Sequence, residues 1–442
     1  MRNMIKRFTP FQLITMEFAA VILFGAILLM LPVSSSAGII TPFNKALFTS
    51  TSAVCVTGLA VLDTGSYWSL FGQFIILLLI QIGGLGVVTV TASVTLLSGR
   101  RISLMQRTTM QNAISAPKIG GIVRLTKFIL KGTFLIELTG AVLLLPVFCR
   151  DYGIRGIWMS IFHSVSAFCN AGFDILGTAQ NTFPSLMKYA GNPVVNIVIM
   201  LLIIIGGIGF LTWEDVCTNK FKFRSYRLQS KIILVTTAIL ILLPSVFFFL
   251  NSFRSLEMNE RILASFFQAV TPRTAGFNTV DIGKMSEVAQ TFIIILMLIG
   301  GSPSSTAGGV KTTTIAVLIL NAFATFRSKD TVSAFNRRID NSVIRDASTL
   351  LVLYVLLFFT GGIAISMYEG LPLEECLYES ASAVGTVGLT LGITPHLHVA
   401  SQMILVALMY LGRVGGLTLI YAVFSSRNKG TARFPVENIT VG

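Results

Sequence analysis

The sequence predicts an all-α integral membrane protein, and two observations carry this prediction. Of the 442 residues, 53% are hydrophobic and only 12% are charged, whereas a soluble domain carries about 25% charged residues. In addition, one short amphipathic pattern that ends in glycine recurs four times, which is typical of one chain built from similar units. Together they predict four parallel helix–pore-loop–helix repeats around a pseudo-fourfold pore, with eight transmembrane helices and four half-inserted pore helices.

The recurring pattern is fourteen residues long, with an aromatic residue at its third place and a glycine that precedes a final Leu or Phe. Such segments are too short and too polar to cross a bilayer, and irregular backbone at membrane depth must be buried in protein or line water. Four loops around one aqueous axis meet that demand; four separate external loops are the alternative. The copies are Ala46–Leu59, Ser160–Phe173, Ala264–Phe277 and Cys376–Leu389, and their aromatic residues are Phe48, Phe162, Phe266 and Tyr378.

Apolar runs flank each copy in pairs and define the repeats. The first run is too long for the apolar part of a cleaved signal peptide and suits a spanning helix. Repeat 1 is 1–98, with expected spans near 11–33 and 70–98; repeat 2 is 99–217, with spans near 121–148 and 193–217. Repeat 3 is 218–326, with spans near 231–251 and 288–326; repeat 4 is 327–425, with spans near 347–368 and 399–425; a tail, 426–442, follows.

Basic residues gather between the repeats and near both ends of the chain. By the positive-inside rule these segments and both termini are cytoplasmic, and the glycine patterns enter from outside. We therefore expect a multi-pass protein of the cytoplasmic membrane. The net charge of +14 follows from this topology, so we expect contact with membrane lipid and none with nucleic acid. The basic segments are 1–10, 99–131, 218–231, 327–345 and 426–442.

The loops around the four glycines are the candidate selectivity filter. A loop that aims carbonyl groups at an ion needs unusual backbone angles and no side chain in the ion's path, which glycine supplies. The preceding short helix points its partly negative end toward the axis and favours a cation. Because no ring of carboxylates is present, a monovalent cation is expected, potassium before sodium. The filter residues are Val56, Thr57, Gly58, Asn170, Ala171, Gly172, Thr274, Ala275, Gly276, Thr386, Val387 and Gly388, with potassium at the glycines Gly58, Gly172, Gly276 and Gly388.

A polar, glycine-rich segment, 300–314, interrupts the second helix of repeat 3 and is the candidate gate. Its proline disfavours a continuous helix, and its hydroxyls and lysine cannot face lipid; we expect the other second helices to be unbroken. A kinked helix is the alternative, and an ATP-binding loop does not match because Val310 separates Gly309 from Lys311. The gate residues are Gly300, Gly301, Ser302, Pro303, Ser304, Ser305, Thr306, Ala307, Gly308, Gly309, Val310, Lys311, Thr312 and, from the last helix, Arg413.

Two arginines stand out in apolar surroundings. Arg413 lies within an apolar helix, where a charge is costly and usually faces a cavity or a partner; we expect it to face the pore and meet the gate loop, with a salt bridge to Glu137 as the alternative. Arg273 adjoins the third glycine pattern, and in the filter wall it would repel a cation. We expect its side chain behind the loop, tied to carboxylates or carbonyls.

The glycines of the second helices are open to two interpretations, tight helix packing or a hinge. The five cysteines show no C-x-x-C spacing and are expected to be packing residues. The three histidines, His163, His396 and His398, belong to no catalytic motif. A membrane-embedded enzyme is the rival class, but the sequence lacks its reactive groups.

The motifs resemble those of the Trk/Ktr/HKT superfamily of potassium transporters, and most of all the bacterial Ktr membrane subunits of the KtrB type. The resemblance covers nearly the whole chain. It rests on the four glycine patterns, on Thr271–Asn278 (TPRTAGFN), on the Gly-Gly-Ser-Pro break and on Gly-Arg413. Like those subunits, the chain starts with the first repeat, and all four filter positions are glycine.

The resemblance implies an activity and partners. The four glycines would select potassium, 300–314 would be the gate loop, and Arg413 would oppose it. The protein would be a homodimer with one pore per subunit, regulated by a cytoplasmic ring of KtrA type that binds ATP or ADP. The tail would lie at the dimer interface. Potassium would be the substrate, sodium an activator as in related members, and no covalent cofactor is implied. A sodium-coupled or poorly selective monovalent cation symporter is the alternative.

Overall fold

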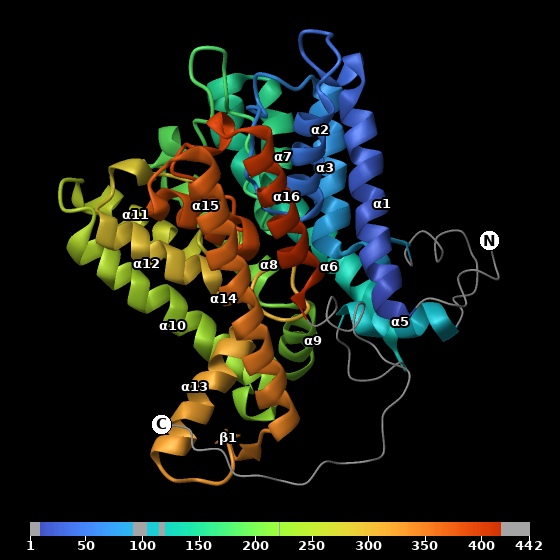
Figure 1. The fold of residues 1–442 in the computed structure, drawn as a ribbon, viewed down its shortest axis with the longest axis vertical. Helices are drawn as coiled ribbons and strands as arrows, with labels where there is room; N and C mark the ends of the chain where they lie inside the picture. The colour runs from blue at the N-terminus through green and yellow to red at the C-terminus, as the bar shows by residue number, and fades with distance from the viewer. Residues whose placement is uncertain (1–8, 92–103, 115–119, 221, 417–442) are drawn as a thin grey trace.

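The structure, a computed structural model, describes residues 9–91, 104–114, 120–220 and 222–416 (Figure 1). The expected tail 426–442 and parts of the linkers lie outside these ranges. Helices dominate the described chain, and its one β-hairpin joins β1 (Ser333–Ala334) to β2 (Arg337–Arg338). Short 3-10 helices occur at Pro32–Ser34, Met187–Tyr189, Phe223–Ser225, Ile282–Lys284 and Thr394–His396.

The same order of helices recurs four times: a long helix, a short helix, then a second apolar helix. The long helices are α1 (Pro10–Met30), α6 (Ile122–Tyr152), α10 (Leu228–Asn251) and α14 (Asn341–Glu369). The short ones are α2 (Phe43–Val54), α7 (Arg155–Phe168), α11 (Met258–Val270) and α15 (Leu373–Gly385). The second apolar helices are α3 (Leu70–Leu85), α8 (Pro193–Gly207), α12 (Glu287–Leu298) and α16 (Val399–Val414). The others are α5 (Leu104–Ile114), α9 (Phe210–Asn219) and α13 (Thr312–Phe326).

Four helices of the described chain, α1, α6, α10 and α14, are long and apolar enough to cross a membrane. The bent pair α8 and α9 also passes when counted as one span, while α3, α12, α13 and α16 are shorter apolar helices. The helical, span-bearing character of the chain is therefore confirmed. The eight crossings and the half-inserted short helices stay predictions. In Figure 1 α13, β1 and the start of α14 extend away from the end that holds α2, α7 and α15.

Three of the short helices are tied to their long helix by a serine hydroxyl. Ser50 Oγ donates to Ile22 O at 2.7 Å, Ser164 to Glu137 O at 2.6 Å, and Ser380 to Phe358 O at 2.7 Å. A glycine on the long helix makes room each time: a Cβ on Gly25, Gly140 or Gly361 would lie 2.5, 2.4 or 2.8 Å from the serine Oγ. The short helices are thus held by polar bonds at positions without side-chain bulk.

The aromatic template fails in the third copy. Phe48, Phe162 and Tyr378 are fully buried, but in α11 Phe267 is buried and Phe266 is 37% exposed. This shift arises because the loop that follows α11 is one residue shorter than the loops that follow the other three short helices. In the other three loops the residue before the glycine bonds to a carbonyl five residues earlier, whereas Ala275 N–H bonds to Thr271 O, four residues earlier, at 2.9 Å. The register of α11 is therefore shifted by one residue.

The expectation that only repeat 3 has a broken second helix is wrong. α3 ends before Gly86, α8 and α9 meet at Gly209 with a bend of 96°, and α16 ends before Gly415. The φ values of these glycines, 84°, 93° and 90°, are strained for other residues.

The other glycines of the second helices serve close packing, as one of the two interpretations held. A Cβ on Gly83, Gly206 or Gly412 would lie 2.0, 2.0 or 2.2 Å from the carbonyl oxygen of Val54, Phe168 or Val384. α3, α8 and α16 therefore each rest on the last turn of the short helix of their own repeat.

The shifted register predicts different effects for two neighbouring residues. Phe267→Ala should lower stability by about 3 kcal/mol because it empties a packed site, while Phe266→Ala should change stability little. Thermal unfolding of the purified protein in detergent measures both. Equal effects, or a larger effect of Phe266→Ala, would contradict the shifted register.

Candidate functional site

The four glycines of the repeated pattern lie in one closed ring, each against the loop of the next repeat. A Cβ built on Gly58 would lie 2.5 Å from Ala171 O, and one on Gly172 would lie 2.5 Å from Ala275 O. A Cβ on Gly276 would lie 2.4 Å from Val387 O, and one on Gly388 would lie 2.1 Å from Thr57 O, which closes the ring. Any side chain would therefore strike the carbonyl group of the neighbouring loop.

The four loops share one unusual backbone angle. The residues two places before the glycines, Val56, Asn170, Thr274 and Thr386, have φ of 57°, 59°, 66° and 52°, although none of them is glycine. The left-handed region costs such residues roughly 1–2 kcal/mol each. Strain of this kind persists only where the surroundings hold it, and it clusters at functional sites.

Hydroxyl groups hold these loops from behind. Ser52 Oγ accepts from Gly58 N at 3.1 Å, and Ser382 Oγ accepts from Gly388 N at 3.0 Å. In the other two loops Ser166 Oγ donates to Phe173 O and Thr271 Oγ1 donates to Phe277 O, both at 2.7 Å. The short helices end just before the ring, so their partly negative ends lie near it.

All twelve residues named for the filter are brought together around this ring. Side chains flanking the glycines are buried and neutral, as the sequence indicates. Asn170 Nδ2 donates to Arg273 O at 3.1 Å and so joins the second loop to the third.

Arg273 itself turns away from the ring. Its side chain is 4% exposed, and its Nη2 donates to Thr237 Oγ1 on α10 at 3.2 Å. The predicted position behind the loop is thus found, but the partner is a hydroxyl and not the expected carboxylate or carbonyl.

A cavity of about 240 Å³ lies on one side of the ring and is lined by all four glycines. Two carboxylates, Asp63 and Asp174, reach it and were missed because they stand outside the glycine template. The carboxylate of Asp63 accepts hydrogen bonds from the backbone N–H groups of Ser66 and Phe183, both at 2.8 Å. Asp174 Oδ1 accepts the backbone N–H of Leu176 at 3.1 Å.

The segment between α12 and α13 folds back on itself. Gly300 N donates to Val310 O at 2.8 Å and Thr312 N donates to Gly301 O at 3.0 Å, which closes the loop at its base. Lys311 Nζ donates to Ala307 O at 2.8 Å. The loop is therefore closed by its own backbone bonds, and the lysine bonds within it.

This loop reaches the residues beneath the ring. A Cβ on Gly308 would lie 2.1 Å from Thr386 Oγ1, and Thr306 Oγ1 bonds to Asn170 Oδ1 at 3.1 Å. Both partners belong to the filter loops, two places before a ring glycine. The predicted gate residues thus adjoin the predicted filter residues.

Arg413 joins this loop to the end of α3. Its guanidinium donates to the carbonyl groups of Thr306 and Gly83, and to Gly84 O at 3.4 Å. Arg413 and Lys311 line a second cavity, of about 190 Å³, beside the loop. The alternative partner, Glu137, instead accepts from Gln81 Nε2 at 3.3 Å, and no ion pair with Arg413 occurs in the described chain.

Comparison with known proteins finds relatives over nearly the whole chain. The profile of the TrkH family, described as cation transport protein, matches residues 3–429. The potassium/sodium uptake protein NtpJ of Enterococcus hirae is 39% identical over 99% of this chain and 98% of its own. The Ktr system potassium uptake protein B of Bacillus subtilis is 38% identical over 99% and 97%. The solved structure of the potassium transporter TrkH from Vibrio parahaemolyticus matches with a TM-score of 0.70 and 17% identity, covering 93% of this chain and 84% of that one, which indicates the same fold.

The ring predicts that Gly58 tolerates alanine less well than a matched glycine. Gly58 and Gly392 both have φ of 95°, but a Cβ on Gly392 meets open space. Gly392→Ala should cost only the backbone strain of about 1–2 kcal/mol, while Gly58→Ala should cost clearly more because of the contact with Ala171 O. Thermal unfolding of the two variants tests this, and equal losses would contradict the ring.

Proposed function

The chain belongs to the TrkH family of cation transport proteins, and on that premise we propose that it takes up potassium as the pore-forming subunit of a Ktr-type system. The observation that carries the proposal is the closed ring of four glycines. Two relatives of nearly equal length, at 39% and 38% identity, are named for potassium uptake. Membership in a family of transport proteins also assigns the chain to transporters and not to enzymes.

The ring selects by replacing water around the ion. Carbonyl groups from four loops cradle a dehydrated cation at Gly58, Gly172, Gly276 and Gly388, and the neutral flanks favour a monovalent ion. The ends of the short helices add partial negative charge. Uptake is driven by the membrane potential, which supplies about 2.3 kcal/mol per charge for each 100 mV.

The loop 300–314 and Arg413 form the gate on the cytoplasmic side of the ring. The loop occupies the path beneath the filter, and the guanidinium adds a positive charge that a cation must pass. Two unit charges 4 Å apart repel by about 4 kcal/mol at an effective dielectric constant near 20. The bonds of Arg413 to Thr306 O and Gly83 O support this closed arrangement.

The assembly follows from the same resemblance. The protein is a homodimer in the cytoplasmic membrane, with both termini and the tail 426–442 on the cytoplasmic side. A KtrA-type ring binds ATP or ADP there and controls the gate. The name of the Bacillus subtilis relative, a component of a Ktr system, supports a second component.

A second candidate is coupled uptake of potassium and sodium, in which sodium is co-transported or acts as an activator. The observation that favours it is the name of the Enterococcus hirae relative, a potassium/sodium uptake protein at 39% identity. Potassium uptake into vesicles with and without external sodium separates the two candidates, because a potassium-only pathway needs no sodium.

Replacing one ring glycine should weaken selectivity in the protein that still folds, in addition to the loss of stability expected for Gly58→Ala. Gly276→Ser puts a side chain against Val387 O, so the preference for potassium over sodium should fall by about tenfold, or 1.4 kcal/mol. Uptake of each ion by a strain deficient in potassium uptake measures this, with Gly392→Ser as the control. Unchanged selectivity in folded Gly276→Ser would remove the filter from the proposal.

Removing the charge of Arg413 should open the pathway. Arg413→Gln removes the charge that repels a passing cation and the guanidinium that bonds both to the gate loop and to α3. Potassium flux without the regulatory ring should therefore rise by at least about tenfold. Potassium flux into liposomes measures it. A loss of folded protein with no rise in flux would show that Arg413 serves structure and not gating.

A further inference from the structure

We propose that α9 holds the gate loop in place, and that Asp215 is the positioning residue that anchors α9 to the start of α10. The inference rests on the proposed function of the loop 300–314 as a gate. It adds an element that lies outside both the ring and the loop.

The bend between α8 and α9 is bonded directly to the gate loop. Phe210 N, the first residue of α9, donates to Ser304 O at 2.7 Å, and Ser302 N donates to Gly207 O at 3.0 Å. A Cβ on Gly209, at the bend, would lie 2.4 Å from Pro303 O. The bend and the loop are thus joined by two backbone bonds and one close approach, so a displacement of α9 must displace the loop or break these bonds.

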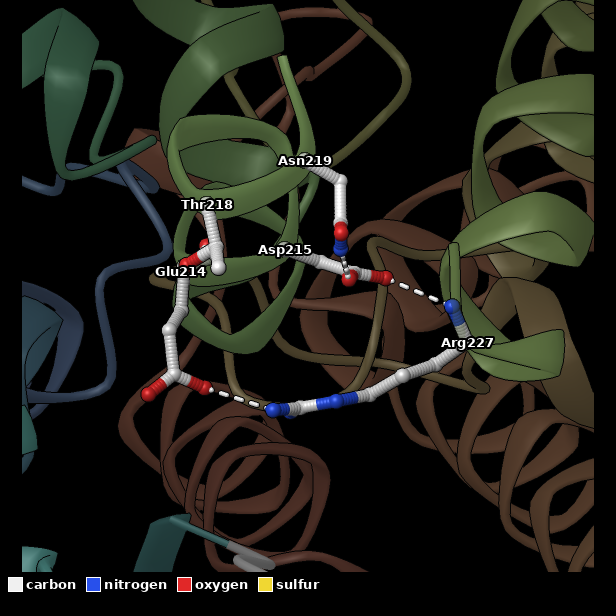
Figure 2. Close-up of polar contacts among 5 residues, drawn as sticks. All are labelled: Glu214, Asp215, Thr218, Asn219 and Arg227. Carbon is white, nitrogen blue, oxygen red and sulfur yellow. Dashed lines mark hydrogen bonds and ion pairs between the residues drawn. The ribbon is translucent and has the colours of Figure 1, made fainter. Parts of the chain in front are cut away.

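The other end of α9 is fixed to α10 through a buried carboxylate (Figure 2). Asp215 is 3% exposed; its Oδ2 accepts the backbone N–H of Arg227 at 2.7 Å, and its Oδ1 accepts from Asn219 Nδ2 at 2.7 Å. Arg227 is the N-cap residue directly before Leu228, the first residue of α10. One side chain in the second half of α9 thus joins this helix to the start of α10.

A second link between these helices is weaker. Arg227 Nη2 lies 3.0 Å from Glu214 Oε2, but the two side chains are 50% and 37% exposed. Exposed ion pairs contribute little to stability, whereas a bond from a backbone N–H to a buried carboxylate is strong. Asp215, and not its neighbour Glu214, is therefore the anchor.

The surroundings leave α9 room to move. A cleft of about 740 Å³ separates it from the start of α6, with Leu211, Glu214 and Cys217 on one wall and Arg124, Leu125 and Phe128 on the other. In Figure 1 α9 lies on the side of α8 that faces away from α7 and α15. When the anchor is released, α9 can tilt into the cleft and withdraw Phe210 N–H from Ser304 O.

Two matched pairs of variants test the anchor in liposomes that contain the full chain without a regulatory ring. Asp215→Ala should raise potassium flux by about tenfold, the factor that corresponds to 1.4 kcal/mol, and Asp215→Asn by less because asparagine keeps one acceptor. Glu214→Gln should stay within about twofold of the parent. Arg227→Pro removes the backbone N–H that Asp215 accepts, at a φ of −60° that proline adopts without strain, and should act like Asp215→Ala. It also removes the arginine side chain, so Arg227→Gln, which keeps the N–H, is the control and should leave the flux unchanged.

A structural readout follows α9 itself. Cys217 on α9 is exposed, while Cys55, Cys169 and Cys376 are buried, so a spin label can be attached to it in a Cys149→Ser background. The label should become more mobile in Asp215→Asn and stay unchanged in Glu214→Gln. Because asparagine is isosteric with aspartate, this variant also serves if Asp215→Ala fails to fold.

Deletion of Ser302–Thr306 separates the inference from the function on which it rests. A rise in flux on deletion, with parental flux in folded Asp215→Asn and Arg227→Pro, would overturn the anchor and leave the gate standing. Flat flux on deletion would overturn the gate and the anchor with it. Equal effects of Glu214→Gln and Asp215→Asn would also overturn the anchor.

Discussion

Irregular backbone in an apolar environment must find its hydrogen-bond and packing partners within the protein, and the rest of this structure depends on that constraint. Four loops without regular structure meet at one ring. Their N–H and C=O groups are satisfied by hydroxyls such as those of Ser52, Ser166, Thr271 and Ser382. Three of the four short helices, α2, α7 and α15, are themselves tied to the long helices by serines packed over glycines. Small polar residues thus fix the ring in two steps: hydroxyls hold the loops against the short helices, and serines hold short helices against the long ones.

Much of the site could be predicted from the sequence because a glycine at a repeated position, or a charge in an apolar segment, is compatible with few structural environments. The spacing of the ring glycines predicted that the four loops meet. The proline and hydroxyls of 300–314 predicted a break, and the isolated charge of Arg413 predicted a polar partner, which is the loop's carbonyl at Thr306. In each case one residue type has few compatible environments, so its presence restricts the structure.

Other features could not be predicted, for two physical reasons. A template anchored on the glycines cannot detect a loop that is one residue shorter, because Phe266 and Phe267 are chemically the same and only packing separates them. Likewise, the breaks at Gly86, Gly209 and Gly415 depend on a single torsion angle at residues that are equally common in unbroken helices. Asp174 and Asp215 carry no sequence signal of their own. Asp174 lines a cavity with residues of the other repeats, and the bond between Asp215 and Arg227 N–H depends on how the chain turns between α9 and α10.

The shorter third loop and the gate loop both belong to the same quarter of the molecule. A channel assembled from four identical polypeptides would have to carry such a turn four times, and four copies would collide on the axis. Fusing the quarters into one polypeptide allows each to drift separately, so three can remain scaffold while one acquires a moving part. Under the proposed function, the gate is then a single segment, and one local movement is enough to open the pathway.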